Sequence, residues 1–269
     1  MNVITKIGRQ KNNPERYNIY LDEKFAFAVD EGTLIKFSLM KGKTLEQFDI
    51  DEIVYDDEIA KAFNRALNYL SYQMRSEQEV RKKLLAAEHG VAVVEEAIRK
   101  LEKLGFLNDE TYSKALLETK KRTAKKGPRA IQQDLMKKGI DKSLQQEVLK
   151  QYSYEEQLQN AKDLADKLVR AGDKSTPTQV KQKIQDLLTR KGYGFDVVSE
   201  VLDQMDITRN DDEWNDLIEK QGDKIWTKYS SKFTGSQLNM KVKQALYQKG
   251  FPVEIINRFI EEKGQEDGE

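Results

Sequence analysis

Residues 135–140 read Leu-Met-Lys-Lys-Gly-Ile, and this pattern returns twice further along the chain. Residues 188–193 read Leu-Thr-Arg-Lys-Gly-Tyr, and residues 246–251 read Leu-Tyr-Gln-Lys-Gly-Phe. An imperfect earlier copy, Ala-Ala-Glu-His-Gly-Val, occupies residues 86–91. Glycine adopts the left-handed conformation at little cost and so ends helices, and a preceding lysine suits the negative end of the helix dipole. Gly90, Gly139, Gly192 and Gly250 therefore predict four equivalent helix ends.

Each of these glycines closes a helix that has its own start signal. The signals are Ser76, Gly127-Pro128, Thr176-Pro177 and Ser236. The spacing of roughly 50 residues is typical of a three-helix repeat that stacks on its neighbours. Asn108-Asp109 is expected to open the second repeat, and Ser153 with Glu156 to form a capping box at the third. We predict a mostly α protein of tandem three-helix repeats in an elongated, curved array, with repeats at 58–107, 108–152, 153–207 and 208–263.

Residues 1–57 differ from the rest and predict a small β-hairpin element followed by an acidic linker. Two runs rich in aromatic and branched residues flank Asp22-Glu23-Lys24, which is expected to form the hairpin turn although it lacks a glycine. Residues 31–37 suggest a short helix. Residues 44–58 hold seven acids and no base, which favours an exposed linker over an acidic contact for a basic partner. Residues 264–269 predict an acidic, frayed tail.

Composition excludes several classes of protein. The 269 residues include 46 Lys plus Arg, 46 Asp plus Glu, one His and no Cys, and the mean hydropathy is −0.77. A chain without Cys has no thiolate nucleophile or Cys-based metal site, and a single His disfavours histidine-driven catalysis. No apolar run approaches the roughly 20 residues that span a bilayer. We expect a cytoplasmic protein that is not an enzyme, holds no metal or cofactor, and does not contact the membrane.

Basic residues concentrate in the predicted second repeat. Residues 114–142 hold ten basic and three acidic residues, a local balance of +7 in a chain of zero net charge. A positive loop beside a helix start suits phosphates or an acidic protein groove, whereas a solvated face explains the same charges about equally well. The candidate contact residues are Lys120, Lys121, Arg122, Lys125, Lys126 and Arg129, followed by Arg75, Arg81 and Lys82.

Several stretches together resemble the bacterial RecX family. Residues 66–70 (Ala-Leu-Asn-Tyr-Leu) and 75–84 (Arg-Ser-Glu-Gln-Glu-Val-Arg-Lys-Lys-Leu) are similar to its opening motif. Residues 104–110 resemble the link into its second repeat, and residues 126–131 with Lys138-Gly139-Ile140 resemble the second-repeat signature. Residues 29–34 look like the longer members from Gram-positive bacteria.

The resemblance implies a function that the residues alone do not name. RecX proteins modulate the RecA recombinase by binding in the groove of its filament on single-stranded DNA, and they inhibit ATP hydrolysis, strand exchange and co-protease activity. It implies tandem three-helix repeats, and we expect a monomer whose contact with single-stranded DNA is weak or indirect. The alternative is a helical-repeat protein that binds single-stranded nucleic acid directly and competes with RecA. The fourth repeat and the N-terminal β element depart from shorter members.

Overall fold

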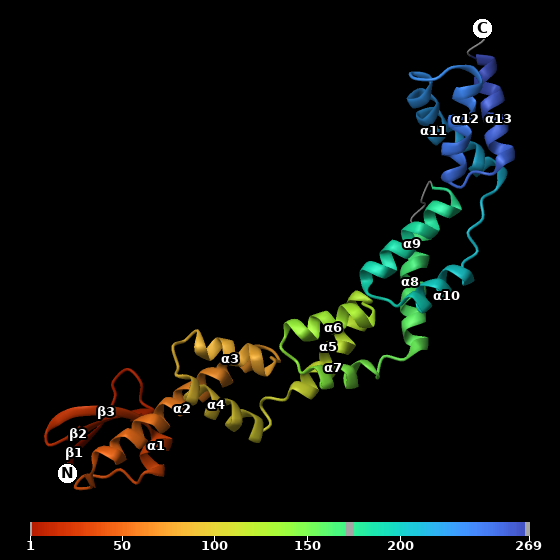
Figure 1. Ribbon diagram of the computed structural model, residues 1–269. Coiled ribbons are helices and arrows are strands. Elements are labelled where there is room, and N and C mark those ends of the chain that lie inside the picture. The colour runs from red at the N-terminus through yellow and green to blue at the C-terminus, as the bar shows by residue number, and fades with distance from the viewer. Residues whose placement is uncertain (1, 171–174, 267–269) are drawn as a thin grey trace. The chain divides into compact units, whose positions relative to one another are not determined.

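The chain is mostly helical, as predicted. A computed structural model describes residues 2–170 and 175–266, and these ranges contain thirteen helices and four strands (Figure 1). The chain divides into two compact units, Met1–Leu116 with Asp134–Val148, and Leu117–Gln133 with Leu149–Glu269. Within the described ranges, no helix combines the length and apolar composition needed to span a bilayer. The elongated, curved arrangement and the repeat boundaries stay predictions.

The elements follow in an order that matches four groups of three helices after a strand-rich start. The N-terminal elements are β1 (Asn2–Arg9), β2 (Arg16–Leu21), β3 (Lys24–Asp30), α1 (Glu31–Lys36) and β4 (Thr44–Leu45). The first two groups are α2 (Gln47–Tyr72), α3 (Glu77–Leu85), α4 (Val91–Lys103), and α5 (Asp109–Ala124), α6 (Pro128–Lys137), α7 (Lys142–Leu149). The last two are α8 (Tyr154–Arg170), α9 (Pro177–Lys191), α10 (Phe195–Gln204), and α11 (Asp211–Ser230), α12 (Gly235–Gln248), α13 (Val253–Glu266).

The N-terminal element is a four-stranded antiparallel sheet in the order β3-β2-β1-β4, larger than the predicted hairpin. The predicted turn is confirmed between β2 and β3. Its two central residues, Asp22 and Glu23, both have positive φ, at 49° and 68°, which matches the twist of two-residue hairpins. Ile4, Ile19 and Val29 are fully buried in the core beneath the sheet.

The predicted acidic linker is wrong, because residues 47–58 form the first turns of the 26-residue helix α2. One of its acids, Asp57, is buried at 2% exposure and accepts three donors. Arg16 Nη2 of β2 lies 2.7 Å from Asp57 Oδ2, the backbone N of Asp30 lies 2.8 Å from Oδ1, and Lys61 Nζ lies 3.0 Å from Oδ2. A buried carboxylate needs such partners. Asp57 therefore fastens the sheet to α2 where an exposed connection was expected.

Replacing Asp57 with Asn is expected to destabilise the protein by about 2 kcal/mol, because the charge that pairs with Arg16 disappears while the side-chain shape remains. The neighbouring Asp56 pairs with the largely exposed Lys36. Asp56→Asn should therefore cost less than about 0.5 kcal/mol. Urea unfolding of the two variants measures the difference, and equal midpoints would contradict the fastening role of Asp57.

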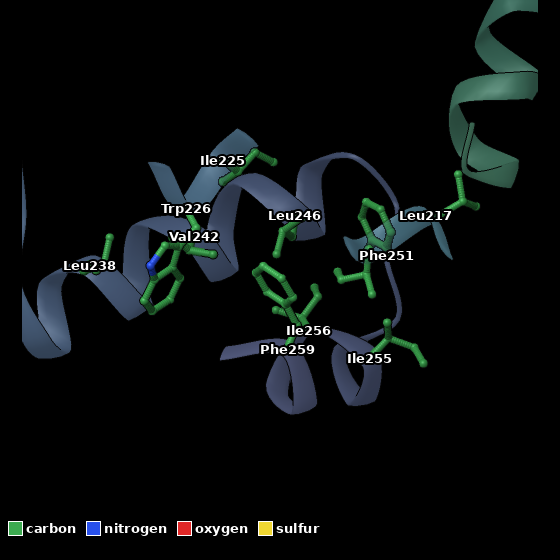
Figure 2. Close-up of a cluster of buried hydrophobic side chains, with 11 residues drawn as sticks. Leu217, Ile225, Trp226, Leu238, Val242, Leu246, Phe251, Ile255, Ile256 and Phe259 are labelled. Carbon is green, nitrogen blue, oxygen red and sulfur yellow. The ribbon is translucent and has the colours of Figure 1, made fainter. Parts of the chain in front are cut away.

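The apolar stripes of the first, third and fourth helix groups each meet in a core of their own. In the first repeat, α2, α3 and α4 bury Ala62, Val80, Leu84, Val94 and Leu101. In the fourth repeat, Figure 2 shows Trp226 of α11, Leu246 of α12 and Phe259 of α13 in one cluster. The rings of Trp226 and Phe259 pack edge to face at 6.3 Å. Trp226 thus belongs to the core of the fourth repeat.

Most predicted helix starts are confirmed. Ser76 and Thr176 cap α3 and α9 with reciprocal capping boxes, and Asn108 Oδ1 accepts from the backbone N of Thr111 at 2.9 Å. Two starts differ. Helix α12 begins at Gly235 after Thr234, one residue before the predicted Ser236. Helix α8 begins after Ser153, but the carboxylate of Glu156 binds Lys121 instead of closing a box. The predicted tail is helical to Glu266, and residues 267–269 lie outside the described residues.

Three of the four predicted glycine ends are confirmed. Gly139, Gly192 and Gly250 have φ of 77°, 91° and 85°. The prediction for the first copy is wrong. Gly90 has φ of −62° and is the N-cap of α4, and the left-handed residue after α3 is Glu88, with φ of 65°.

Each left-handed glycine also touches the start of the middle helix in the preceding repeat. Ser76 Oγ donates to the carbonyl of Lys138 at 2.7 Å, and Thr176 Oγ1 donates to the carbonyl of Lys249. Between the second and third repeats, the backbone N of Gly127 donates to the carbonyl of Lys191 at 2.8 Å. The carbonyl groups at one helix end thus satisfy donors at the start of another, with the dipoles aligned. We call this recurring contact the middle-helix joint.

A side chain at the joint has no room. A Cβ added at Gly192 would overlap the backbone N and Cβ of Ala130, whereas a Cβ at Gly105, which also has positive φ (76°), would meet nothing within 4 Å. Gly105→Ala is therefore expected to cost about 1–2 kcal/mol for the backbone conformation alone. Gly192→Ala should cost clearly more, because the helices must also move apart. Thermal unfolding compares the two variants, and equal losses would contradict a close-packed joint.

Candidate partner-binding surface

The basic stretch lies at the end of α5, the connection that follows it and the start of α6. Helix α5 ends at Ala124, and Lys125 turns the chain with a positive φ of 44°. Gly127 precedes Pro128, whose fixed φ suits the first helical position of α6. The third repeat holds this turn, because Lys191 Nζ donates to the carbonyl of Ala124 at 2.9 Å and Tyr193 Oη donates to the carbonyl of Lys125 at 3.0 Å. The turn is therefore clamped by α9 and the residues after it.

Lys121 points into the protein. It is only 7% exposed, and its Nζ lies 2.9 Å from Glu156 Oε2 and 3.0 Å from Glu118 Oε1. The ammonium also lies 5.0 Å from the centre of the Tyr152 ring. Burial by itself lowers the pKa of Lys121, but the hydrogen bonds to Glu156 and Glu118 outweigh it and raise the pKa above its ordinary value. The ion pairs of Lys121 thus hold α5 against α8.

Lys125 has a similar internal role. Its Nζ pairs with Asp163 of α8 and lies 3.3 Å from Asn160 Oδ1. The ammonium of Lys125 lowers the pKa of Asp163 below its ordinary value, mainly through this hydrogen bond. Lys126 is half-buried and also has an interaction partner. Part of the positive charge counted from the sequence is therefore neutralised by acidic side chains inside the second compact unit.

Three of the six cations remain directed outward. Arg122 and Arg129 are exposed, and Lys120 is half-buried. Arg129 is held by its backbone, whose N donates to the carbonyl of Gly192 at 3.1 Å, so its side chain starts from a fixed point beside the joint. We call Lys120, Arg122 and Arg129 the outward cations. They flank the turn after α5 and are the members of the predicted set best placed to meet a partner.

The three candidate cations of the first repeat also divide into internally paired and accessible residues. Arg81 is held by two carboxylates, with Nη2 2.6 Å from Glu77 Oε1 and a second pair with Glu95. Lys82 is exposed. Arg75 lies flat on the Tyr69 ring, with its guanidinium carbon 4.3 Å from the ring centre. Only Lys82 and Arg75 present groups suited to an outside partner.

Sequence reasoning missed the acidic partners of these cations. Glu156 and Asp163 lie 35 and 38 residues after the lysines they bind. Their one local signal was the capping pattern at Ser153, which suggested a different use for Glu156. Among residues 2–170 and 175–266, no group of three or more acidic or histidine side chains is placed to hold a metal ion.

Removing Lys121 tests its internal role. Lys121→Met should cost about 1–2 kcal/mol, because Glu156 and Glu118 lose their shared cation but stay partly in water. The exposed neighbour Arg122 is the matched control, and Arg122→Met should cost less than about 0.5 kcal/mol. Because the folded pKa of Lys121 is raised, the difference should persist at neutral pH and disappear only as the pH rises through that pKa. Urea unfolding at pH 7 measures this difference in stability, and an unchanged midpoint for Lys121→Met would contradict the structural role of Lys121.

Family profiles match the chain along nearly its whole length. The profile of the regulatory protein RecX N-terminal domain matches residues 2–46, ending one residue before α2 begins. The profiles of the first and second RecX three-helix domains match residues 62–101 and 108–149. The profile of the third matches twice, at 155–202 and 211–260, so the third and fourth repeats share one pattern. The chain belongs to the RecX regulatory protein family.

RecX relatives and solved RecX structures agree with this membership. The chain is 41% identical to the regulatory protein RecX of Bacillus licheniformis over 265 residues, covering 98% of this chain and 100% of the relative. It is also 41% identical to that of Bacillus subtilis, covering 98% and 99%. A crystal structure of regulatory protein RecX superposes with a TM-score of 0.67 at 40% identity, covering 76% of this chain and all of that one. RecX from Lactobacillus salivarius gives a TM-score of 0.53 at 34% identity, over 56% of this chain and 99% of that one.

Proposed function

We propose that this RecX-family chain is a negative regulator of the RecA recombinase. It binds in the groove of the RecA filament on single-stranded DNA and inhibits ATP hydrolysis, strand exchange and co-protease activity. Membership of the RecX regulatory family carries the proposal. The repeats support it, because tandem units offer several weak contacts whose combined strength grows through effective concentration.

The outward cations supply one contact within this proposal. Lys120, Arg122 and Arg129 lie beside a turn that hydrogen bonds from the third repeat hold in place. A partner that binds these cations therefore has little additional backbone to order. Their charges suit carboxylates of the filament or phosphates of its DNA. Bridging several protomers would resist the movements that ATP turnover needs. Lys121 and Lys125 support this contact indirectly, by holding α5 on α8.

Reversing the outward cations should weaken inhibition without unfolding the protein. In a RecA ATPase assay on single-stranded DNA, Lys120→Glu, Arg122→Glu and Arg129→Glu combined should raise the concentration for half-inhibition at least about tenfold. A control with the same change in net charge combines Lys11→Glu, Lys24→Glu and Lys41→Glu, all exposed in the N-terminal element. It should inhibit like the unaltered chain, and circular dichroism should be the same for all three proteins. Full inhibition by the first triple variant would remove the outward cations from the interface.

Direct binding to single-stranded DNA is the competing function, because cations beside a helix start also suit phosphates. Titration of labelled single-stranded DNA with and without RecA separates the two. Filament regulation predicts much tighter binding in the presence of RecA. Equal affinity without RecA, falling steeply with salt, would favour the competing function.

A further inference from the structure

A hollow of about 370 Å³ opens in the first compact unit, between the end of α2 and the turn from α4 to α5. Most of its wall is apolar, and one cation reaches it. Its lining residues are Leu67, Leu70, Ser71, Met74, Arg75, Gly105, Phe106, Asn108 and Thr111. We call it the first-repeat pocket. Its volume lies in the range of sites that take a bulky side chain or a small ligand.

The pocket lies within an exposed apolar surface. Met74 and Phe106 line it at 50% and 54% exposure, and Leu104 and Tyr72 nearby are 55% and 85% exposed. The Phe106 ring is not loose, because its edge packs against Phe63 with ring centres 6.5 Å apart. Exposed apolar side chains that line a hollow on a folded domain are typical of an interaction site. The apolar wall is therefore preformed and faces solvent.

The cation at the pocket, Arg75, is oriented but lacks a close carboxylate. Its guanidinium is held on the Tyr69 ring, and the amide oxygen of Gln73, when turned toward it, accepts from Nη2 at 2.9 Å, from Nε at 3.3 Å and from Nη1. The nearest carboxylate, Glu79, is 3.9 Å from Nη1, which exceeds hydrogen-bonding distance.

Glu79 is committed elsewhere. Its carboxylate binds Lys138 Nζ at 2.6 Å and the backbone N of Ser76 at 3.1 Å, and the Tyr112 hydroxyl also bonds to it. Burial by itself raises the pKa of Glu79, but the hydrogen bonds from Lys138 and Ser76 lower it below the ordinary value. Glu79 thus remains ionised and belongs to the joint between α3 and α6. Its ion pair with Arg75 is long, at 3.9 Å, so a carboxylate from outside can approach the Arg75 guanidinium more closely.

We propose that the first-repeat pocket receives a bulky apolar side chain of a protein partner, while a carboxylate beside that side chain in the partner pairs with Arg75. The apolar wall matches the side chain, and the single oriented guanidinium matches one carboxylate at its rim. Because the apolar wall and the Arg75 guanidinium are already held in place, binding loses little conformational entropy.

A protein segment fits this surface better than a nucleic acid strand does. A strand presents successive phosphates and needs a row of free cations. Several cations of this unit are paired with carboxylates, Lys138 with Glu79, Arg81 with Glu77 and Glu95, and Lys114 with Glu110. Lys83 and Lys100 lie instead over the Tyr69 and Phe63 rings, at 5.6 and 4.6 Å from the ring centres. Arg75 beside a hollow of aliphatic and aromatic groups is the complement of an apolar residue next to an acid.

The inference rests on the proposed function, in that the protein partner is the RecA filament. It adds a contact of a different chemical kind from the outward cations. An apolar anchor is insensitive to salt, whereas contacts to exposed cations weaken as salt rises. The pocket contact and the contact through the outward cations should therefore differ in how strongly they depend on ionic strength.

Two variants test the pocket in the RecA ATPase assay. Met74→Glu places a charge in the wall, and Arg75→Gln removes the cation but keeps most of its stem. Each should raise the concentration for half-inhibition about tenfold or more. Val91→Glu is the matched control, because Val91 is an apolar residue 66% exposed on the same repeat and does not line the pocket. It should inhibit like the unaltered chain, and thermal unfolding should be the same for all of these proteins.

The outcomes distinguish the pocket from the proposed function. If the unaltered chain inhibits and both pocket variants inhibit equally well, the pocket proposal is overturned and filament regulation stands.

If the unaltered chain does not inhibit, the proposed function fails, and a second measurement decides on the pocket. Amide NMR shifts are then followed with acetyl-Phe-Asp-Asp-amide and acetyl-Ala-Asp-Asp-amide. Shifts at Met74, Arg75 and Phe106 with the first peptide only, absent in Met74→Glu, would support the pocket. Their absence, or the same shifts with single-stranded DNA, would overturn it.

Discussion

The close contact between the end of one middle helix and the start of another is the constraint on which the repeats depend. It needs a residue that is both left-handed and without a side chain, because a Cβ at Gly139, Gly192 or Gly250 would overlap the preceding repeat. The donors at the start of α3, α6 and α9 then meet carbonyl groups that have no partner within their own helix. The first, third and fourth repeats each have a small core of their own, and these polar contacts link the middle helices of successive repeats.

Charged side chains serve two purposes in this fold. Asp57, Lys121 and Lys125 are structural, because each satisfies groups from elements distant in sequence. Arg129 is held through its backbone, and Arg75 through its contact with the Tyr69 ring, while the side chains of Arg122 and Arg129 are exposed. This division lets a chain of zero net charge present localised positive groups to a partner without losing its internal ion pairs.

The features that depend on neighbours in sequence were predictable. Glycine spacing, capping boxes and the two-residue turn follow from local conformational preferences, and the structure confirms most of them. Two local signals were misplaced, the helix end at Gly90 and the helix start at Ser236, but the larger failures involve distant partners. Residues 47–58 look exposed by composition, yet Asp57 meets Arg16, 41 residues earlier, and the helix extends through them. Likewise, the count of charges could not separate Lys121 from Arg122, since only folding brings Glu156 to one of them. The first-repeat pocket was not predictable either, because two segments about 30 residues apart in the chain enclose it.

The terminal repeats do not carry both halves of the middle-helix joint, and this bears on self-assembly. After α3, the left-handed position is held by Glu88, so this helix end carries a side chain where the joints have glycine. At the opposite terminus of the array, Thr234 precedes α12 with no side-chain bond to the helix, unlike Ser76 and Thr176. We expect these differences to disfavour the addition of a second copy of the chain by the contact that joins the repeats. The third and fourth repeats match the same profile, so the chain contains two units of one pattern joined internally by that contact.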